Sequence, residues 1–151
     1  MMEDQRPKTL EHIAEVGKIL EIIANELHYR SLLHDQSKLE SPEKEIFDEY
    51  TPKLRDTTYG SDEYKQYLTE MKVALDHHYA SNRHHPEHFE NGIKGMNLVD
   101  LVEMFCDWLA ATKRHADGDI HKSIELNQTR FEYSDDIKSI LQNTADILRE
   151  V

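Results

Sequence analysis

The stretch His34-Asp35-Gln36-Ser37-Lys38 organises the chain, because it places a histidine next to an aspartate and a lysine shortly after them. A neutral imidazole and a carboxylate are both ligands of first-row transition metals. Lys38 follows Asp35 by three positions, nearly one helical turn, so their side chains are predicted to share a face. These residues can therefore bind a metal together with an anion that contacts it, and the remaining ligands must come from elsewhere in the chain.

The size and composition of the chain predict one soluble domain. Its 151 residues are enough for a domain with its own core, and 38% of them are hydrophobic and 32% charged. The net charge of −12 disfavours general binding to nucleic-acid backbones. The single cysteine, Cys106, excludes an intramolecular disulfide, and with the absence of a signal peptide it suggests a cytoplasmic protein. No apolar run is long enough for a membrane span, and a homo-oligomer remains open.

Helical spacing of apolar residues is the main structural signal, and no segment has the alternation of a strand. We predict helices at 8–29, 30–39, 42–50, 62–80, 98–116, 119–131 and from 134 onward. The segments 51–60 and 84–96 are predicted loops. The predicted fold class is therefore all-α, a single compact domain of residues 1–151. Within it, residues 12–115 would form the core of a metal site, and the helices within 119–150 would serve packing.

Four further histidine and aspartate positions are candidate metal ligands. His12 lies on the apolar stripe of its helix and is predicted to point inward. Of the adjacent His77 and His78, only His78 continues the apolar stripe of the preceding helix, although a loosened helix end would bring in both. Asp107 lies in the middle of a helix that is apolar nearly all round, where a buried carboxylate needs a cation or a hydrogen-bond partner.

Neighbouring residues are candidates for supporting roles. Asp100, near the start of its helix, is predicted to be a solvated acid that interacts with the helix dipole. Glu103 is predicted to accept a hydrogen bond from a ligand histidine. His84 and His85 are placed either to contact substrate and transfer a proton, or to form part of the structure of their loop.

The ordered set of His12, His34-Asp35, the paired histidines and Asp107 resembles the HD superfamily of metal-dependent phosphohydrolases. In this resemblance, the residues that match the H…HD…D ligands of the superfamily are His12, His34, Asp35 and Asp107. The HDxxK form and the paired histidines at 77–78 resemble the HD-GYP branch, in which the lysine meets substrate phosphate and the extra histidines bind a second metal. The chain is also similar to a small HD-like family of bacterial and phage proteins with the pattern HDxSK…HHYxxNRHHPEHF…DLxEMxCDW.

The chain departs from the HD-GYP branch at two places. The Gly-Tyr-Pro signature is absent, and residues 83–88 stand in its neighbourhood, so the resemblance does not extend to cyclic di-GMP hydrolysis. No glutamate lies one turn before His12, because that position is Lys8. The resemblance therefore implies one or two metal ions rather than a fixed pair.

The leading prediction is an enzyme that hydrolyses a phosphate ester in a nucleotide or a related small molecule. Histidine and carboxylate ligands favour Mn, Fe, Co, Ni or Zn over Mg. Such a metal lowers the pKa of a bound water and polarises the phosphoryl oxygens. Asp35 would also orient the water, while Lys38 with Arg83 or Arg114 would bind the phosphate charge.

Two other functions fit the same residues. A few HD proteins that resemble this chain at the ligands are di-iron oxygenases, which use four histidines and two aspartates. Alternatively, the chain is a non-catalytic module, in which a metal holds the helices together or a nucleotide binds without being turned over. Lys38 favours hydrolysis, because a cation directed at phosphate is most useful in that reaction.

Overall fold

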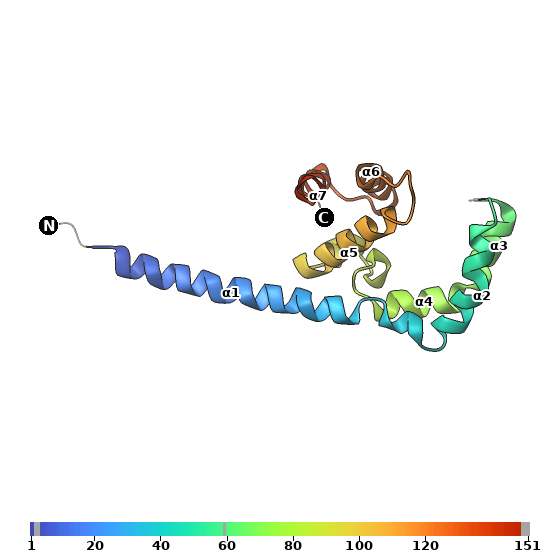
Figure 1. Ribbon diagram of the computed structural model, residues 1–151, viewed down its shortest axis with the longest axis horizontal. Coiled ribbons are helices and arrows are strands. Elements are labelled where there is room, and N and C mark those ends of the chain that lie inside the picture. Colours follow the sequence, from blue (N-terminus) through green and yellow to red (C-terminus); the bar gives the residue numbers. More distant parts are fainter. Residues whose placement is uncertain (2–3, 59, 149–151) are drawn as a thin grey trace. The chain divides into compact units, whose positions relative to one another are not determined.

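A computed structural model describes residues 1, 4–58 and 60–148, and all of its regular structure is helical (Figure 1). The α-helices are α1 Arg6–Leu33, α2 Glu43–Arg55, α3 Asp62–Glu70, α4 Lys72–Ser81, α5 Leu98–Thr112, α6 Ile120–Phe131 and α7 Asp135–Ile147. Three short 3-10 helices accompany them, η1 Gln36–Leu39, η2 Pro86–His88 and η3 Gly92–Gly95. No strand occurs in the described residues, so the predicted all-α class is confirmed.

The chain divides into two units, residues 1–34 and residues 35–151, and each is described by itself. The single domain over residues 1–151 therefore stays a prediction. The end of the predicted packing region, at residues 149 and 150, lies outside the described residues. Across the described ranges, none of the helices combines the length and the apolar character needed to cross a membrane.

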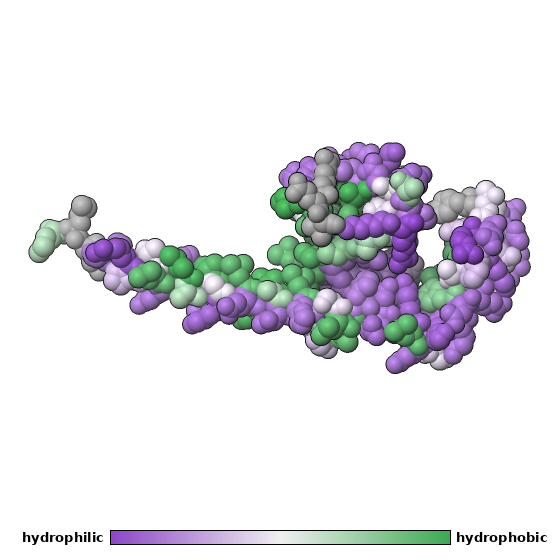
Figure 2. All heavy atoms as spheres, in the orientation of Figure 1, coloured by the Kyte–Doolittle hydropathy of each residue, from purple (hydrophilic) through white to green (hydrophobic). Residues whose placement is uncertain are grey.

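Unit 1 consists mainly of α1, a helix of 28 residues that begins with Pro7 in its first turn. Proline is well suited to this position, because the first N–H groups of a helix have no partner within it. Within α1 no side chain is buried, and Leu10, Ile13 and Leu20 are all exposed. Figure 2 shows apolar side chains along one edge of α1 and polar ones along the opposite edge. His12, predicted to point inward, is exposed on this helix.

The predicted helix over residues 30–39 is wrong. Residues up to Leu33 extend α1, the chain leaves the helix at His34, whose ψ is 124°, and Asp35 follows with a φ of 56° in the left-handed region. Aspartate tolerates this conformation better than most residues with a side chain. The backbone N–H of Lys38 then donates to the carbonyl of Asp35 at 2.9 Å, which closes the first turn of η1.

The segment after η1 is more helical than the sequence suggested. Ser41-Pro42 is a cis peptide, and α2 begins at Glu43. It continues through Pro52 to Arg55, so the predicted loop 51–60 begins only after Arg55. Proline lacks the N–H donor but keeps its carbonyl, which accepts a hydrogen bond from the N–H of Asp56 at 3.2 Å in the last turn.

The predicted helix 62–80 is divided in two at Met71, which ends α3 and precedes α4. Ser61 caps the start of α3, because its Oγ accepts a hydrogen bond from the N–H of Tyr64 at 3.1 Å. Helix α2 contacts both α3 and α4, and α4 also contacts η1 and η2. The turn before η1 and the segment after α4 therefore meet at the C-terminal end of α4.

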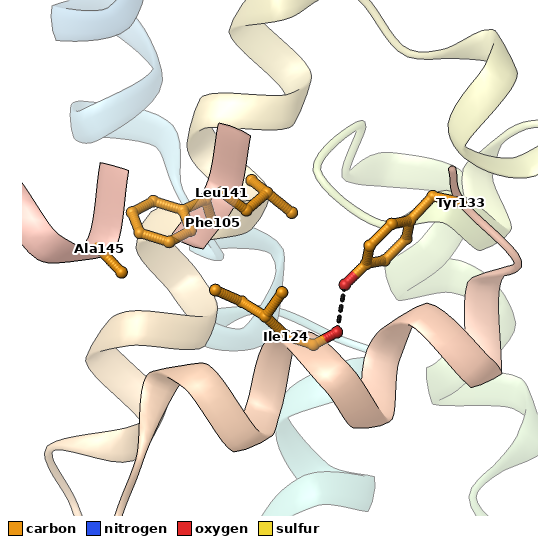
Figure 3. Close-up of a cluster of buried hydrophobic side chains, with 5 residues drawn as sticks. All are labelled: Phe105, Ile124, Tyr133, Leu141 and Ala145. Atoms are coloured by element: carbon orange, nitrogen blue, oxygen red, sulfur yellow. Dashed lines mark hydrogen bonds between the residues drawn. The ribbon is translucent and has the colours of Figure 1, made fainter. Parts of the chain in front are cut away.

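Helices α5, α6 and α7 share the main hydrophobic core of unit 2 (Figure 3). Phe105 of α5, Ile124 of α6, and Leu141 and Ala145 of α7 are buried together. Tyr133 joins them, and its hydroxyl donates a hydrogen bond to the carbonyl of Ile124. In the described residues, the last two helices thus pack against α5.

Side chains also cap the starts of the last three helices. Asn97 and Asp100 form a reciprocal capping box at the start of α5. Asp119 and Ser134 accept backbone N–H groups at the starts of α6 and α7. Helix α5 ends at Thr112, earlier than the predicted residue 116.

Candidate metal centre

Four side chains of unit 2 converge at the end of α4, and we call them the His-Asp cluster: Asp35, His78, His84 and His85. Each offers one ligand atom, and these atoms all lie within 4.8 Å of one another. Asp35 comes from the turn before η1, His78 from the last turn of α4, and the other two from the segment that follows α4. His85 precedes Pro86 and has the extended backbone that a following proline favours, with φ −97° and ψ 127°.

The spacing of these atoms fits a shared metal ion. Nitrogen and oxygen ligands about 2.0–2.2 Å from a tetrahedral ion lie roughly 3.3–3.6 Å from one another. Asp35 Oδ1 is 3.5 Å from His78 Nε2 and 3.4 Å from His84 Nε2. His78 Nε2 and His85 Nε2 are 2.9 Å apart, slightly closer than such a geometry requires. Small adjustments of the side chains would bring the four atoms around one ion.

His78 is held in place by Glu43, a residue of the first turn of α2 that is 0% exposed. Glu43 Oε2 is 2.8 Å from His78 Nδ1. An ionised carboxylate only accepts hydrogen bonds, so Nδ1 is the donor, and Nε2 of the neutral ring keeps its lone pair. This lone pair belongs to the nitrogen that faces Asp35 and His85 in the cluster. Such a carboxylate contact orients a histidine ligand and makes it more basic.

His84 lies against a different carboxylate. Its Nδ1 is 3.1 Å from Glu103 Oε1 of α5, and the His84 side chain is 1% exposed. Glu103 was predicted to accept a hydrogen bond from a ligand histidine, and the structure places its carboxylate at ion-pair distance from His84. Two of the three histidines in the cluster therefore have a carboxylate at Nδ1 and direct Nε2 toward Asp35.

The local environment favours the neutral form of His78 and His85. Burial opposes ionisation of Glu43, but hydrogen bonds from His77, Ser37 and His78 outweigh it and lower the pKa of Glu43 below its ordinary value. Burial, followed by the charge of Lys38, lowers the pKa of His78. Burial and the neighbouring histidines lower the pKa of His85 to about 3. Neutral imidazoles are the form that binds a metal.

Lys38 is placed next to the cluster, as the three-residue spacing predicted. Its Nζ donates to Asp35 Oδ2 at 2.7 Å, while Asp35 Oδ1 is the oxygen directed at the histidines. The ammonium also lies 5.8 Å from the centre of the Phe47 ring. With 42% of its side chain exposed, Lys38 remains accessible from solvent.

The other predicted ligands are not members of the His-Asp cluster. His12 and His34 belong to unit 1, so their part in the site stays a prediction. Asp107 is half-buried on α5, and one of its oxygens lies within 4.8 Å of a ring nitrogen of His84. His77 is outside the His-Asp cluster, and its Nδ1 instead donates to Glu43 Oε1 at 2.6 Å. The predicted difference between the two neighbours is confirmed, since His78 is buried and His77 is half-exposed.

Of the residues predicted to transfer protons or bind substrate, some belong to the His-Asp cluster and others do not. His84 and His85, the candidates for proton transfer, are both in the cluster, which favours a role as ligands. Arg114 is exposed beyond the end of α5. Arg83 donates from Nε to Asp100 Oδ1 at 3.1 Å and from Nη2 to Asp100 Oδ2 at 2.9 Å. This two-bond contact gives Arg83 a structural role, and its contact with substrate stays a prediction.

The prediction that Asp100 is solvated is wrong, because Asp100 is 0% exposed. Its Oδ2 accepts the backbone N–H of Asn97 at 3.1 Å, in addition to the guanidinium of Arg83. Position near a helix start could not distinguish this arrangement from a solvated acid. What buries the carboxylate is an arginine 17 residues away in the sequence.

Glu43 is the functional candidate that the sequence analysis missed. An acid in the first turn of a helix is common, because it interacts favourably with the helix dipole. Glu43 at the start of α2 therefore gave no reason to expect a functional role. Only the packing of α2 against α4 shows that this carboxylate contacts two histidines. No local feature of the sequence indicates that contact.

Comparison with known proteins gives a family but no activity. No curated protein and no solved structure matches the chain significantly. A protein-family model, described as a family of unknown function, matches residues 1–151, the whole of the given sequence. The chain that carries the His-Asp cluster therefore belongs to the family of unknown function DUF5662.

Proposed function

We propose that this chain is a metal-dependent phosphohydrolase that acts on a small phosphate ester. One observation carries the proposal. Three histidines and Asp35 offer ligand atoms that all lie within 4.8 Å of one another, while the carboxylates of buried Glu43 and of partly buried Glu103 contact Nδ1 of two of these histidines. A cluster that only packed the core would not need two of its rings to be contacted by carboxylates from two separate helices.

The residues of the cluster suit a transition metal. Imidazole ligands with one carboxylate favour Mn, Fe, Co, Ni or Zn over Mg. When bound, such an ion would act as a Lewis acid on a phosphoryl oxygen and lower the pKa of a coordinated water. Asp35 would hold this ion through Oδ1, while its Oδ2 fixes the ammonium of Lys38 beside the cluster.

Lys38 supports a phosphate substrate rather than a purely structural metal. Its ammonium is accessible and lies on the outer side of Asp35, where it would neutralise a phosphate oxygen as negative charge develops in the reaction. The net charge of −12 makes such a local cation more important, because the rest of the surface repels anions. A nucleotide substrate, a cytoplasmic location and self-association belong to the same proposal.

The test is elemental analysis of protein purified without chelators or a histidine tag, followed by phosphate-release assays. We expect about one transition-metal ion per chain, lost in Asp35→Asn and in His84→Ala and retained in His121→Ala. His121 is a suitable control, because it lies on α6 and pairs with Asp146 outside the cluster. Wild type should hydrolyse 4-nitrophenyl phosphate or bis(4-nitrophenyl) phosphate with added Mn. Lys38→Met should retain the metal and lose about 100-fold or more in rate.

Other outcomes would contradict the proposal in distinct ways. A protein that takes up no metal, or takes up equal amounts in His84→Ala, would show that the cluster is not a metal site. Two iron ions per chain with oxygen consumption would indicate the di-iron oxygenase instead. A tightly bound metal with no hydrolysis of any ester would indicate a binding or structural module.

A further inference from the structure

Next to the His-Asp cluster, unit 2 contains a cavity of about 490 Å³ whose lining includes His85 and Asp107. This volume is within the usual range for pockets that bind small molecules. His85 is a member of the cluster, and Asp107 approaches His84. A molecule in this cavity would therefore lie directly against the candidate metal centre.

Three helices supply aromatic rings to the wall of this cavity. Tyr79 comes from α4, Trp108 from α5 and Phe131 from the end of α6. The rings of Trp108 and Phe131 are nearly parallel, with an interplanar angle of 6° and centroids 6.2 Å apart. Flat, rigid surfaces of this kind favour a flat aromatic guest over a saturated one of the same size.

The aromatic wall is fixed by a contact with Arg130, which also lines the cavity. The Arg130 guanidinium lies 4.6 Å from the centre of the Phe131 ring, and its Nη2 donates to Glu87 Oε1 at 2.8 Å. A guanidinium placed over a ring in this way adds a favourable electrostatic contact. Arg130 thus holds the ring of Phe131 in place, which pre-organises the cavity for a ligand.

Polar groups on one wall could bind substituents of such a ring. Ser123 and Asn127 lie one turn apart on α6, and both line the cavity. Asn127 Nδ2 donates to Ser123 Oγ at 3.3 Å, so both side chains have a defined orientation. The amide and the hydroxyl retain further hydrogen-bonding capacity. The cavity therefore combines aromatic walls with a few polar groups, the usual composition of a small-molecule site.

We propose that this cavity binds a planar aromatic ring of the substrate and that the phosphate ester joined to the ring lies at His85 and Asp107. The substrate class is then an aromatic phosphate ester, either an aryl phosphate or a nucleoside phosphate, which share a flat ring and an anionic phosphate. The position of the phosphate rests on the proposed function. The ring site rests on the cavity alone and can be tested without hydrolysis.

The sole tryptophan of the chain, Trp108, lines the cavity, so its fluorescence excited at 295 nm reports ligand binding directly. The probes are phenyl phosphate and cyclohexyl phosphate, which carry the same charge on rings of similar size, and adenosine monophosphate. They are titrated into chelator-treated protein and into metal-loaded protein. We expect a saturable change with phenyl phosphate and about three- to tenfold weaker binding of cyclohexyl phosphate, because only the aromatic ring stacks. The tighter of the two aromatic probes identifies the source of the ring.

A pair of variants on α5 locates the binding site. Ala111 lines the cavity, whereas the neighbouring Ala110 does not line it, and both are exposed. Ala111→Leu should reduce the affinity for phenyl phosphate at least tenfold by filling the cavity, and Ala110→Leu should leave it unchanged. If Ala111→Leu does not fold, the comparison of phenyl and cyclohexyl phosphate on the wild type decides the question.

Failure of the ring site and failure of the phosphohydrolase give different results. Equal affinities for phenyl and cyclohexyl phosphate, no change in Trp108 emission, or equal binding by both alanine variants would overturn the ring site. Phosphate release without any preference for aromatic esters would leave the enzyme proposal standing and remove the ring site. Selective binding of phenyl phosphate without hydrolysis by metal-loaded protein would support the ring site and contradict the phosphohydrolase.

Discussion

Glu43 is the residue on which the geometry of the candidate metal centre depends most. Its two oxygens accept hydrogen bonds from Nδ1 of two consecutive histidines, at 2.6 Å from His77 and 2.8 Å from His78. Each contact fixes the orientation of a ring that would otherwise rotate about its side-chain bonds. Only His78 extends to the cluster, so His77 serves to hold the carboxylate in position for its neighbour.

Replacing this carboxylate should weaken metal binding without unfolding the protein. In Glu43→Gln, the amide oxygen can accept only one of the two histidine N–H groups with similar geometry, and its NH₂ group cannot accept at all. We expect metal affinity to fall about 10- to 100-fold, the usual effect of losing such a contact to a ligand histidine. The measurement is a competition titration against a chromophoric chelator.

Glu45→Gln is the matched control for this substitution. Glu45 is in the same first turn of α2 but is exposed, so its replacement removes the same charge without touching a histidine. Equal losses of affinity in both variants would mean that only overall charge matters and that Glu43 does not orient His78.

For single residues, the sequence predicts the burial and contacts that follow from position along one helix or turn. It does not predict contacts with partners that are distant in the sequence. The helical spacing of α4 correctly separated buried His78 from half-exposed His77. The interval between Asp35 and Lys38 correctly placed their side chains together. In contrast, the contacts of Glu43 and Asp100 come from residues 34 and 17 positions away, and no local pattern contains them.

At the scale of the element, helix starts were predicted better than helix ends. Ser61, Asn97, Asp119 and Ser134 each accept a backbone N–H within the next three residues, so their own chemistry defines the start. The end of α1, the passage of α2 through Pro52 and the division at Met71 lack such a local signal. These boundaries depend on how the elements pack, which the sequence pattern does not reveal.

The start of α5 is stabilised by the contact between buried Asp100 and the half-exposed side chain of Arg83. Asp100→Ala removes the two hydrogen bonds from the guanidinium and the one from the N–H of Asn97. We expect a loss of about 2–4 kcal/mol in the free energy of unfolding, from the cap and the charged hydrogen bonds together. Urea denaturation followed by circular dichroism measures it.

The control for Asp100 is an exposed ion pair of the same type. Asp48→Ala breaks the contact with Lys44 on the surface of α2, which should cost less than about 1 kcal/mol. If the two variants lose the same stability, the burial of Asp100 does not make its contacts stronger, and the structural role assigned to Arg83 is wrong.

The packing of α6 against the segment before α7 should make stability depend on pH in the alkaline range. Burial raises the pKa of Tyr133 to about 12, whereas an unfolded tyrosine has a pKa near 10. Between these values the folded protein keeps the proton that the unfolded chain has lost. Stability should therefore be unaffected below about pH 9.5 and fall by up to about 1.4 kcal/mol per pH unit from pH 10 to 12.

Comparison with Tyr133→Phe isolates this contribution, because the remaining tyrosines titrate in both proteins. The variant loses the hydrogen bond to the carbonyl of Ile124, so it should be less stable at neutral pH but should show a shallower decline above pH 10. Urea midpoints measured from pH 8 to 11.5 give both slopes. Parallel curves for the two proteins would contradict a raised pKa at Tyr133.

At the scale of the whole molecule, the chain is strongly acidic, and its candidate metal ligands are brought together from separate segments. A net charge of −12 attracts cations generally, so weak binding of a divalent ion would not by itself indicate a site. A specific site differs because its ligand atoms meet only in the folded chain. The ligands come from distant positions in the sequence: Asp35 precedes η1, His78 is on α4, and His84 follows α4. His84 also contacts Glu103 of α5.

Metal binding should therefore raise the thermal stability of this protein specifically through the His-Asp cluster. An ion that binds the folded state and not the unfolded state contributes about 2.7 kcal/mol at 100 times its dissociation constant. For a chain of this length, that corresponds to an increase in Tm of about 5–10 °C. Chelator-treated protein with added Zn or Mn should show this shift by differential scanning calorimetry. Mg should give a smaller one, because imidazole ligands favour transition metals.

Two variants separate the cluster from the general acidic field of the surface. His84→Ala removes one ligand and should abolish most of the shift, whereas His121→Ala removes a histidine on α6 outside the cluster and should keep it. Both variants retain the net charge of −12, counted with neutral histidines, so a purely electrostatic effect would stabilise them equally. Equal shifts in both would therefore mean that the convergence of these side chains has no thermodynamic consequence, and the metal centre would have to be abandoned.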